Sequence, residues 1–305
     1  MGEIITWLKT PIWKDGALTV WMIAAILFVV LIILLFCYFL GKKRKKTFPP
    51  QDSLTTQQPA RFCEIEIANL QGLGNRSEQQ DAFGLSPAID IASNGLFAVL
   101  CDGMGGMAEG GRIARETVSE LLSVFPWKSN DVILSKIREC SKKVYEQFLG
   151  HGGTTLVATH VFQNKLWFWC VGDSDLFLQR KGRLYALNIR QEYRNDLLLR
   201  ALDGAFAIEE IFTDPQAGAL CEYIGKKDIA CETPRIPFVL QPEDMLLLCS
   251  DGISDTLSLK EICDAMNEAP QDCCSILEDK IISANLPHQD NYTAIILKYH
   301  KNQED

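Results

Sequence analysis

The sequence lacks the patterns by which cysteine and histidine bind zinc or build a disulfide framework. Its 305 residues include 11 cysteines and 4 histidines, but there is no C-x-x-C pair and no Cys/His spacing typical of metal ligands. The cysteine number is odd, and residues such as Cys101, Cys170 and Cys249 lie inside apolar runs. We therefore expect reduced, buried thiols in a cytosolic setting.

Positive charge is scarce beyond residue 60. The chain has 30 basic and 39 acidic residues; the first 60 residues hold 7 and 3 of them, so residues 61–305 hold 23 and 36, a net charge of −13. Such a balance argues against nucleic acid as a partner. No internal repeat or low-complexity tract is present either.

Charge is absent altogether from Ala17 to Leu40, a run of 24 residues. As a helix this run is about 36 Å long, enough to cross a hydrocarbon core of about 30 Å. A secretory signal peptide is the alternative, but its apolar region is shorter and ends at a small-residue cleavage site. This run ends instead at Gly41 and the basic stretch KKRKK. The sequence predicts a retained transmembrane helix over residues 17–40.

The distribution of basic residues around this helix predicts its orientation. Five basic residues follow the helix, whereas only Lys9 and Lys14 precede it. The positive-inside rule therefore places the C-terminal part in the cytoplasm and residues 1–16 outside. Residues 41–60 read as a basic, proline-containing juxtamembrane linker, and a folded domain is expected over residues 61–305.

Apolar periodicity in this domain predicts a mixed or antiparallel sheet core with helices packed outside, because strands and helices do not alternate strictly. A section at about 190–235 has no sustained strand pattern and could be a loop-rich subdomain over an active site. The expected strands cover residues 62–68, 96–101, 155–162, 166–171, 244–249 and 292–298; the expected helices cover 108–124, 130–149, 258–267 and 272–284.

Several apolar strands end in a carboxylate. LFAVLC leads to Asp102, LWFWCVG to Asp173 and MLLLCS to Asp251; Asp81 follows RSEQQ, and Asp290 lies just before the last expected strand. Buried, unpartnered carboxylates are costly, so their convergence on divalent cations is the better explanation. A set of oxygen ligands without His or Cys favours Mg²⁺ or Mn²⁺. The glycine-rich GMGGMA after Asp102 also fits a dinucleotide-binding pattern, but two helices follow where that fold needs a helix and a strand.

These stretches together resemble one family. GNRSEQQDAF, VLCDGMGGMAEGG, GGTTLVAT, VGDSDLF, LCSDGISD and QDNYTAIIL are similar, in order and spacing, to the motif series of the type 2C metal-dependent Ser/Thr protein phosphatases, especially bacterial members. The resemblance implies an α+β fold, a β-sandwich of two antiparallel sheets flanked by helices (αββα). It also implies that the section at 190–235 is the family's variable flap.

The same resemblance implies a binuclear centre of Mn²⁺ or Mg²⁺. Asp102 would bridge both ions, and the backbone carbonyl of Gly103 would be a further ligand. Asp251 and Asp290 would complete the shell of one ion. Asp81 matches an acidic residue close to the metals that acts through bound water.

Three further positions carry implied roles. Asp173 and Asp255 match positions that can hold a third metal ion. Arg76 matches the family's phosphate-binding arginine, and a planar guanidinium suits two phosphoryl oxygens.

The function implied is hydrolysis of phosphoserine and phosphothreonine in proteins phosphorylated by a Ser/Thr kinase, by attack of a metal-bridging water or hydroxide. With the predicted helix, this gives a single-pass protein of the bacterial cytoplasmic membrane whose catalytic domain is cytoplasmic and whose lipid contact is residues 17–40. A catalytically silent, phosphoprotein-binding membrane scaffold of the same fold is the alternative. It would be favoured by a missing metal aspartate, and none is missing.

Three residues depart from patterns that are common in the family. Met104 stands where many eukaryotic members have a histidine, as is usual in bacterial members, so no protein general acid is evident at that position. Gln80 is neutral where a carboxylate is common, so the second metal would be held more weakly. Asp175 stands where the family usually has Arg, which removes a positive charge near the centre.

Overall fold

The computed structural model describes residues 60–62, 65–104 and 109–300, which belong to one compact unit, Gln58–Asp305. The predicted segment 1–16, the predicted transmembrane helix 17–40 and nearly all of the linker 41–60 lie outside the described residues. Among the residues that are described, no helix has both the length and the apolar character needed to cross a membrane.

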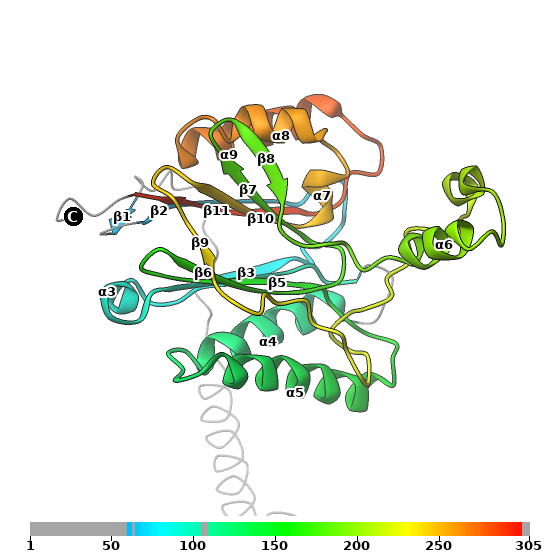
Figure 1. Cartoon of the computed structure of the whole chain (residues 1–305), viewed down its shortest axis with the longest axis horizontal. Coiled ribbons are helices and arrows are strands. Elements are labelled where there is room, and N and C mark those ends of the chain that lie inside the picture. The colour runs from blue at the N-terminus through cyan, green and yellow to red at the C-terminus, as the bar shows by residue number, and fades with distance from the viewer. Residues whose placement is uncertain (1–59, 63–64, 105–108, 301–305) are drawn as a thin grey trace, which may run out of the picture. The chain divides into compact units, whose positions relative to one another are not determined.

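Two antiparallel sheets form the centre of this unit (Figure 1). The six-stranded sheet has the order β1 (Ala60–Phe62), β2 (Ile65–Gly72), β11 (Tyr292–Tyr299), β10 (Met245–Cys249), β7 (Asp175–Arg180) and β8 (Arg183–Ala186). The five-stranded sheet has the order β3 (Ala82–Leu85), β4 (Leu96–Cys101), β5 (Leu156–Phe162), β6 (Lys165–Val171) and β9 (Phe238–Val239).

Helices cover the outer face of each sheet. Figure 1 shows α4 and α5 beside the five-stranded sheet and α8 and α9 beside the six-stranded sheet. The helices are α3 (Ile91–Asn94), α4 (Gly110–Ser123), α5 (Asn130–Phe148), α6 (Tyr193–Leu202), α7 (Asp251–Ser254), α8 (Leu259–Ala265) and α9 (Pro270–Ala284), with short 3₁₀ turns η1 (Ala88–Asp90) and η2 (Ile208–Thr213). The predicted αββα sandwich is confirmed.

Burial on both faces explains why the central strands are apolar without interruption. In β4, Leu96, Ala98 and Leu100 pack between the two sheets. The alternate residues, including Phe97 and Val99, pack against α4 and α5. Because successive side chains of a strand point to opposite faces, a strand covered on both sides has no position left for a polar residue.

The elements expected from periodicity are present, with ends that differ by a few residues. The β7–β8 hairpin and α7 were not expected as separate elements. The section at 190–235 contains α6 and η2, whose buried residues Leu197, Ala201 and Ile211 form a small apolar cluster of their own. In Figure 1, α6 lies beyond the end of the sheets. The nine cysteines of the described part are free thiols, and six are buried.

Candidate metal centre and active site

Antiparallel pairing brings the predicted acidic residues to one end of the sandwich. Asp81 immediately precedes β3 and Asp102 immediately follows β4, and these two strands are antiparallel neighbours. Asp173 follows β6, which runs in the same direction as β4 because both are antiparallel to β5. In the other sheet, Asp251 follows β10 and Asp290 precedes the neighbouring antiparallel strand β11. Each sheet thus contributes carboxylates at the same end.

Asp102 lies at the centre of this group, and its electrostatics reflect that position. Burial raises the pKa of Asp102 well above its usual range, and the charges of Asp81, Asp251 and Asp173 raise it further. The pKa of Asp251 is raised to about 7, chiefly by burial and then by the charges of Asp173 and Asp255. Deprotonated carboxylates at this end of the sandwich therefore destabilise one another unless a cation is present.

The pKa values of Asp81 and Asp173, at the edge of the group, are also raised. Burial raises the pKa of Asp81 to about 6, against the opposing effect of its hydrogen bonds. One of these is donated by Ser250 Oγ to Asp81 Oδ2 over 2.8 Å. Burial likewise raises the pKa of Asp173 to about 6, although the positive charge of Arg190 lowers it. Raised carboxylate pKa values in a group of this kind are typical of functional sites.

The donor atoms of this group fit divalent cations by their chemistry. Asp81 Oδ1 and Asp251 Oδ1 are buried and have no hydrogen-bond partner among the described residues. The group that approaches both residues is Asp102, a third carboxylate, which can donate only when it is protonated. Hard oxygen ligands carrying negative charge are what Mg²⁺ and Mn²⁺ prefer.

The coordination geometry itself is not preformed. Within the described ranges, no group of three or more His, Cys, Asp or Glu side chains is arranged so that it could hold a metal ion as it stands. The fit to a metal therefore rests on the shared burial, the raised pKa values and the unpartnered oxygens. The individual ligand assignments from the sequence remain predictions.

Arg76 and Asp255 lie at the rim of the group and are engaged in ion pairs. Arg76 Nη2 contacts Asp290 Oδ2 at 2.5 Å, and both side chains are partly exposed. The predicted phosphate-binding cation is thus next to a predicted metal ligand. Asp255 Oδ1 accepts a hydrogen bond of 2.6 Å from Arg190 Nη1, and its side chain is 61% exposed. Of the predicted acidic residues, Asp255 is the one paired with Arg190.

Glycines allow close backbone approach around these residues. A Cβ on Gly103 would lie 2.5 Å from the carbonyl carbon of Gly110, at the start of α4, and 2.6 Å from the carbonyl oxygen of Gln80. A Cβ on Gly252 would lie 2.0 Å from the carbonyl oxygen of Asn291. These contacts are with backbone and cannot be relieved by rotating a side chain, so both positions require glycine.

Gln80 and Asp175, which depart from the family pattern, each have defined partners in the structure. The side-chain amide of Gln80 donates to Glu78 Oε1 over 3.0 Å, and its backbone carbonyl accepts from Gly103 N. Gln80 therefore contacts the site through its backbone. Asp175 is buried and forms an ion pair with Arg190, whose Nη2 is 2.7 Å from Asp175 Oδ2. The positive charge absent at position 175 is present at position 190.

Ser250 and Arg190 are site residues that sequence reasoning did not identify. Ser250 follows β10 directly and could have been found as the polar residue between the strand and Asp251. Arg190 lies in the irregular section with no periodic pattern around it, so nothing in the sequence linked it to Asp175.

Comparison with known proteins identifies the family. The model for protein phosphatase 2C matches residues 73–289, and the chain therefore belongs to this family. It is 29% identical over 189 residues to the serine/threonine phosphatase stp of Listeria welshimeri, a match that covers 57% of this chain and 72% of that protein. The chain is a serine/threonine protein phosphatase of a metal-dependent family.

Solved structures agree with the fold. The serine/threonine phosphatase of S. agalactiae superimposes with a TM-score of 0.64 and 25% identity, covering 78% of this chain and 100% of that one. The catalytic domain of the serine/threonine protein phosphatase PstP, solved in complex with two manganese ions, gives a TM-score of 0.62 and 21% identity, covering 78% and 99%.

Proposed function

We propose that this phosphatase hydrolyses phosphoserine and phosphothreonine in proteins at a divalent metal centre held by the carboxylates between the two sheet ends. The observation that carries the proposal is the burial of Asp102 among three other carboxylates that raise its pKa. A protein retains such mutual repulsion where a bound cation offsets it. Two Mn²⁺ or Mg²⁺ ions at this place would supply an activated water and neutralise phosphoryl charge.

The residues proposed to hold these ions are those that the sequence predicts. They are Asp102 in the bridging position, the carbonyl of Gly103, the carboxylates of Asp251 and Asp290, and Asp81 through bound water. Asp173 is suited to a further, weaker site because its charge raises the pKa of both Asp102 and Asp251. Asp255 would have to leave Arg190 to join it.

Arg76 is the residue proposed to bind the substrate phosphate. Its guanidinium is half exposed at the rim of the carboxylate group, where a phosphoryl group could reach it from solvent. Its ion pair with Asp290 keeps the cation beside the site. A guanidinium can donate two parallel hydrogen bonds to phosphoryl oxygens and so orient them for in-line attack.

The proposal is tested by phosphate release from phosphoserine and phosphothreonine peptides by the purified chain. We expect release that needs Mn²⁺ or Mg²⁺, stops with excess EDTA, and is lost in Asp102→Asn. Binding of the peptides without release at saturating Mn²⁺ would support the silent scaffold instead. The substrates expected in the cell are the products of a Ser/Thr kinase.

We further propose that the chain is anchored in the cytoplasmic membrane through residues 17–40, with the phosphatase domain in the cytoplasm. The support is the uncharged run of 24 residues and the five basic residues that follow it. At about 36 Å such a helix would span the bilayer with a small tilt.

Protease added outside intact cells should therefore leave the domain from Arg61 to the C-terminus uncut. The positive-inside rule is the physical reason, because the basic run after Leu40 is held on the cytoplasmic side. Immunoblotting with an antibody to the domain, before and after lysis, measures protection. Digestion of the domain without lysis would show the reverse orientation.

A further inference from the structure

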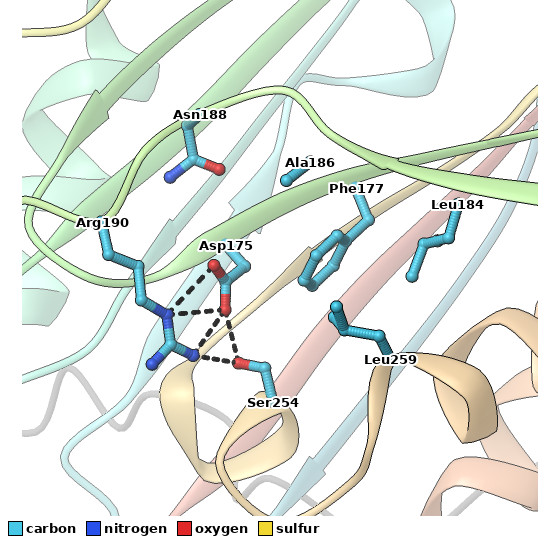
Figure 2. A pocket seen from close by; sticks show the side chains of 8 residues that line it. All are labelled: Asp175, Phe177, Leu184, Ala186, Asn188, Arg190, Ser254 and Leu259. Carbon is cyan, nitrogen blue, oxygen red and sulfur yellow. Dashed lines mark hydrogen bonds and ion pairs between the residues drawn. The ribbon is translucent and has the colours of Figure 1, made fainter. Parts of the chain in front are cut away.

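Asp175 is a buried carboxylate held by an unusually complete set of donors. Arg190 Nη2 donates to Asp175 Oδ2 over 2.7 Å, and Arg190 Nε lies 3.2 Å from both carboxylate oxygens. Ser254 Oγ donates to the same Oδ2 over 2.5 Å. Figure 2 shows the three side chains meeting at one point. A buried carboxylate in such a site depends on its partner cation to remain charged.

The same guanidinium also reaches α7, the helix that begins at Asp251. Arg190 Nη2 donates to Ser254 Oγ over 2.7 Å, and Nη1 donates to Asp255 Oδ1 over 2.6 Å. These two acceptors are the last residue of α7 and the residue after it. Arg190 therefore joins the start of β7 to the end of α7.

The next residue, Gln191, ties the same segment to the β6–β7 turn. Its backbone N–H donates to the carbonyl of Gly172 over 2.9 Å, and its Oε1 accepts from Gly172 N over 2.8 Å. Gly172 directly precedes Asp173. The carbonyl of Gln191 in turn accepts from Cys221 N, within the flap section at 190–235. Residues 190 and 191 thus connect the flap to the two segments that carry Asp173 and Asp251.

The Arg190 guanidinium is held by polar contacts and borders a cavity on one side. A cavity of about 360 Å³ borders its side chain and that of Asp175, and apolar residues such as Phe177 and Leu259 line part of it. Because no side chain of the described residues packs against the guanidinium on the side of this cavity, its ion pairs and hydrogen bonds fix its orientation there. Loss of the guanidinium would therefore remove the polar contacts that join the end of α7 to the start of β7.

We propose that Arg190 is a positioning residue for the phosphatase reaction. Its guanidinium fixes the end of α7 against the start of β7, and so positions Asp251, at the start of α7, and Asp173, two residues before β7. The inference rests on the proposed function in that Asp251 and Asp173 are proposed metal ligands. Arg190 is not itself proposed as a ligand, because it acts on Asp251 and Asp173 through Asp175, Ser254 and Asp255.

Two variants of the full chain separate positioning from simple charge compensation. Arg190→Gln leaves the buried Asp175 with the hydrogen bond from Ser254 but without a partner cation, so the melting temperature without metal falls. Arg190→Gln with Asp175→Asn removes the stranded charge and recovers most of that loss. The contacts to Ser254 and Asp255 are missing in both variants. We therefore expect Mn²⁺ affinity, measured by calorimetry, to stay about tenfold weaker in both.

Amide hydrogen exchange supplies a readout that needs no metal. In the double variant we expect exchange to be about tenfold faster in α7 and in the turn containing Asp173, whereas β4 keeps its protection. The matched control is Arg180→Gln with Asp244→Asn. Arg180 and Asp244 form a second Arg–Asp pair, with Arg180 Nε 2.7 Å from Asp244 Oδ1, at the other end of β7. The control should leave Mn²⁺ affinity and α7 exchange unchanged.

Two results would overturn the inference. Wild-type Mn²⁺ affinity and wild-type α7 exchange in the Arg190→Gln, Asp175→Asn protein would reduce Arg190 to a charge compensator. Equal effects in the Arg180 control would show a general loss of stability. If the wild-type chain binds no Mn²⁺, the proposed function fails, and hydrogen exchange alone decides on Arg190.

Discussion

Asp251→Asn is expected to lower kcat/KM for a phosphopeptide by about 10³-fold, or ~4 kcal/mol of transition-state stabilisation. The substitution keeps the shape of the side chain but removes a charged oxygen from the proposed metal shell. At the same time, the metal-free protein should become more stable. The raised pKa of Asp251, about 7, means that its buried charge opposes folding at pH 8. Removing that charge should stabilise the metal-free fold by on the order of 2 kcal/mol.

Lower activity together with higher metal-free stability distinguishes the loss of a metal ligand from the loss of a structural residue. Activity is measured at saturating Mn²⁺, and unfolding is measured in urea with EDTA. Asp279→Asn, at an exposed position of α9, is the control and should change neither quantity. Activity of the Asp251 variant within tenfold of wild type, or a loss of metal-free stability, would count against the assignment.

The metal-free protein is expected to gain about 2 kcal/mol of stability when the pH falls from 8 to 6. The folded pKa values of Asp251, Asp81 and Asp173, at about 7, 6 and 6, all exceed 3.8, the ordinary pKa of an aspartate side chain. Between pH 3.8 and these values the folded state therefore binds more protons than the unfolded state. Each proton that it takes up as the pH falls removes part of the repulsion around Asp102.

His160 contributes to the pH dependence of stability with the opposite sign. Burial lowers the pKa of His160 below 6.5, so the unfolded state gains a proton there first as the pH falls. This is one group against several carboxylates, so the net change should keep its sign. Urea unfolding in EDTA at pH 8, 7 and 6 measures the effect, and saturating Mn²⁺ should remove it. Stability in EDTA that is constant or falls toward pH 6 would contradict the electrostatics described for the site.

The sequence is informative about this site where the fold buries both faces of a strand. Such strands are continuous apolar runs, and a carboxylate at the end of a run is conspicuous. Asp102 and Asp251 could be found in this way. Antiparallel pairing places Asp81 beside Asp102 and Asp290 beside Asp251, and the packing of one sheet on the other brings the two pairs together.

Contacts made by irregular segments could not be predicted in the same way. Asp175 was recognised as a departure that removes a positive charge, but its partner is 15 positions along the chain, beyond the β7–β8 hairpin. No periodicity constrains the segment that carries Arg190. The pairing is set by where the hairpin returns the chain, which is a property of the tertiary structure. Helix α6 was missed for a related reason, because its apolar residues pack in a small separate cluster.

Anomalous diffraction at the manganese edge, from crystals of the chain grown with Mn²⁺, tests the central claim most directly. The account predicts two manganese peaks between the ends of the two sheets, both in contact with Asp102, with Asp251 and Asp290 around one of them. No peak at this end of the sandwich at saturating Mn²⁺, or peaks only at acidic residues elsewhere on the surface, would contradict it.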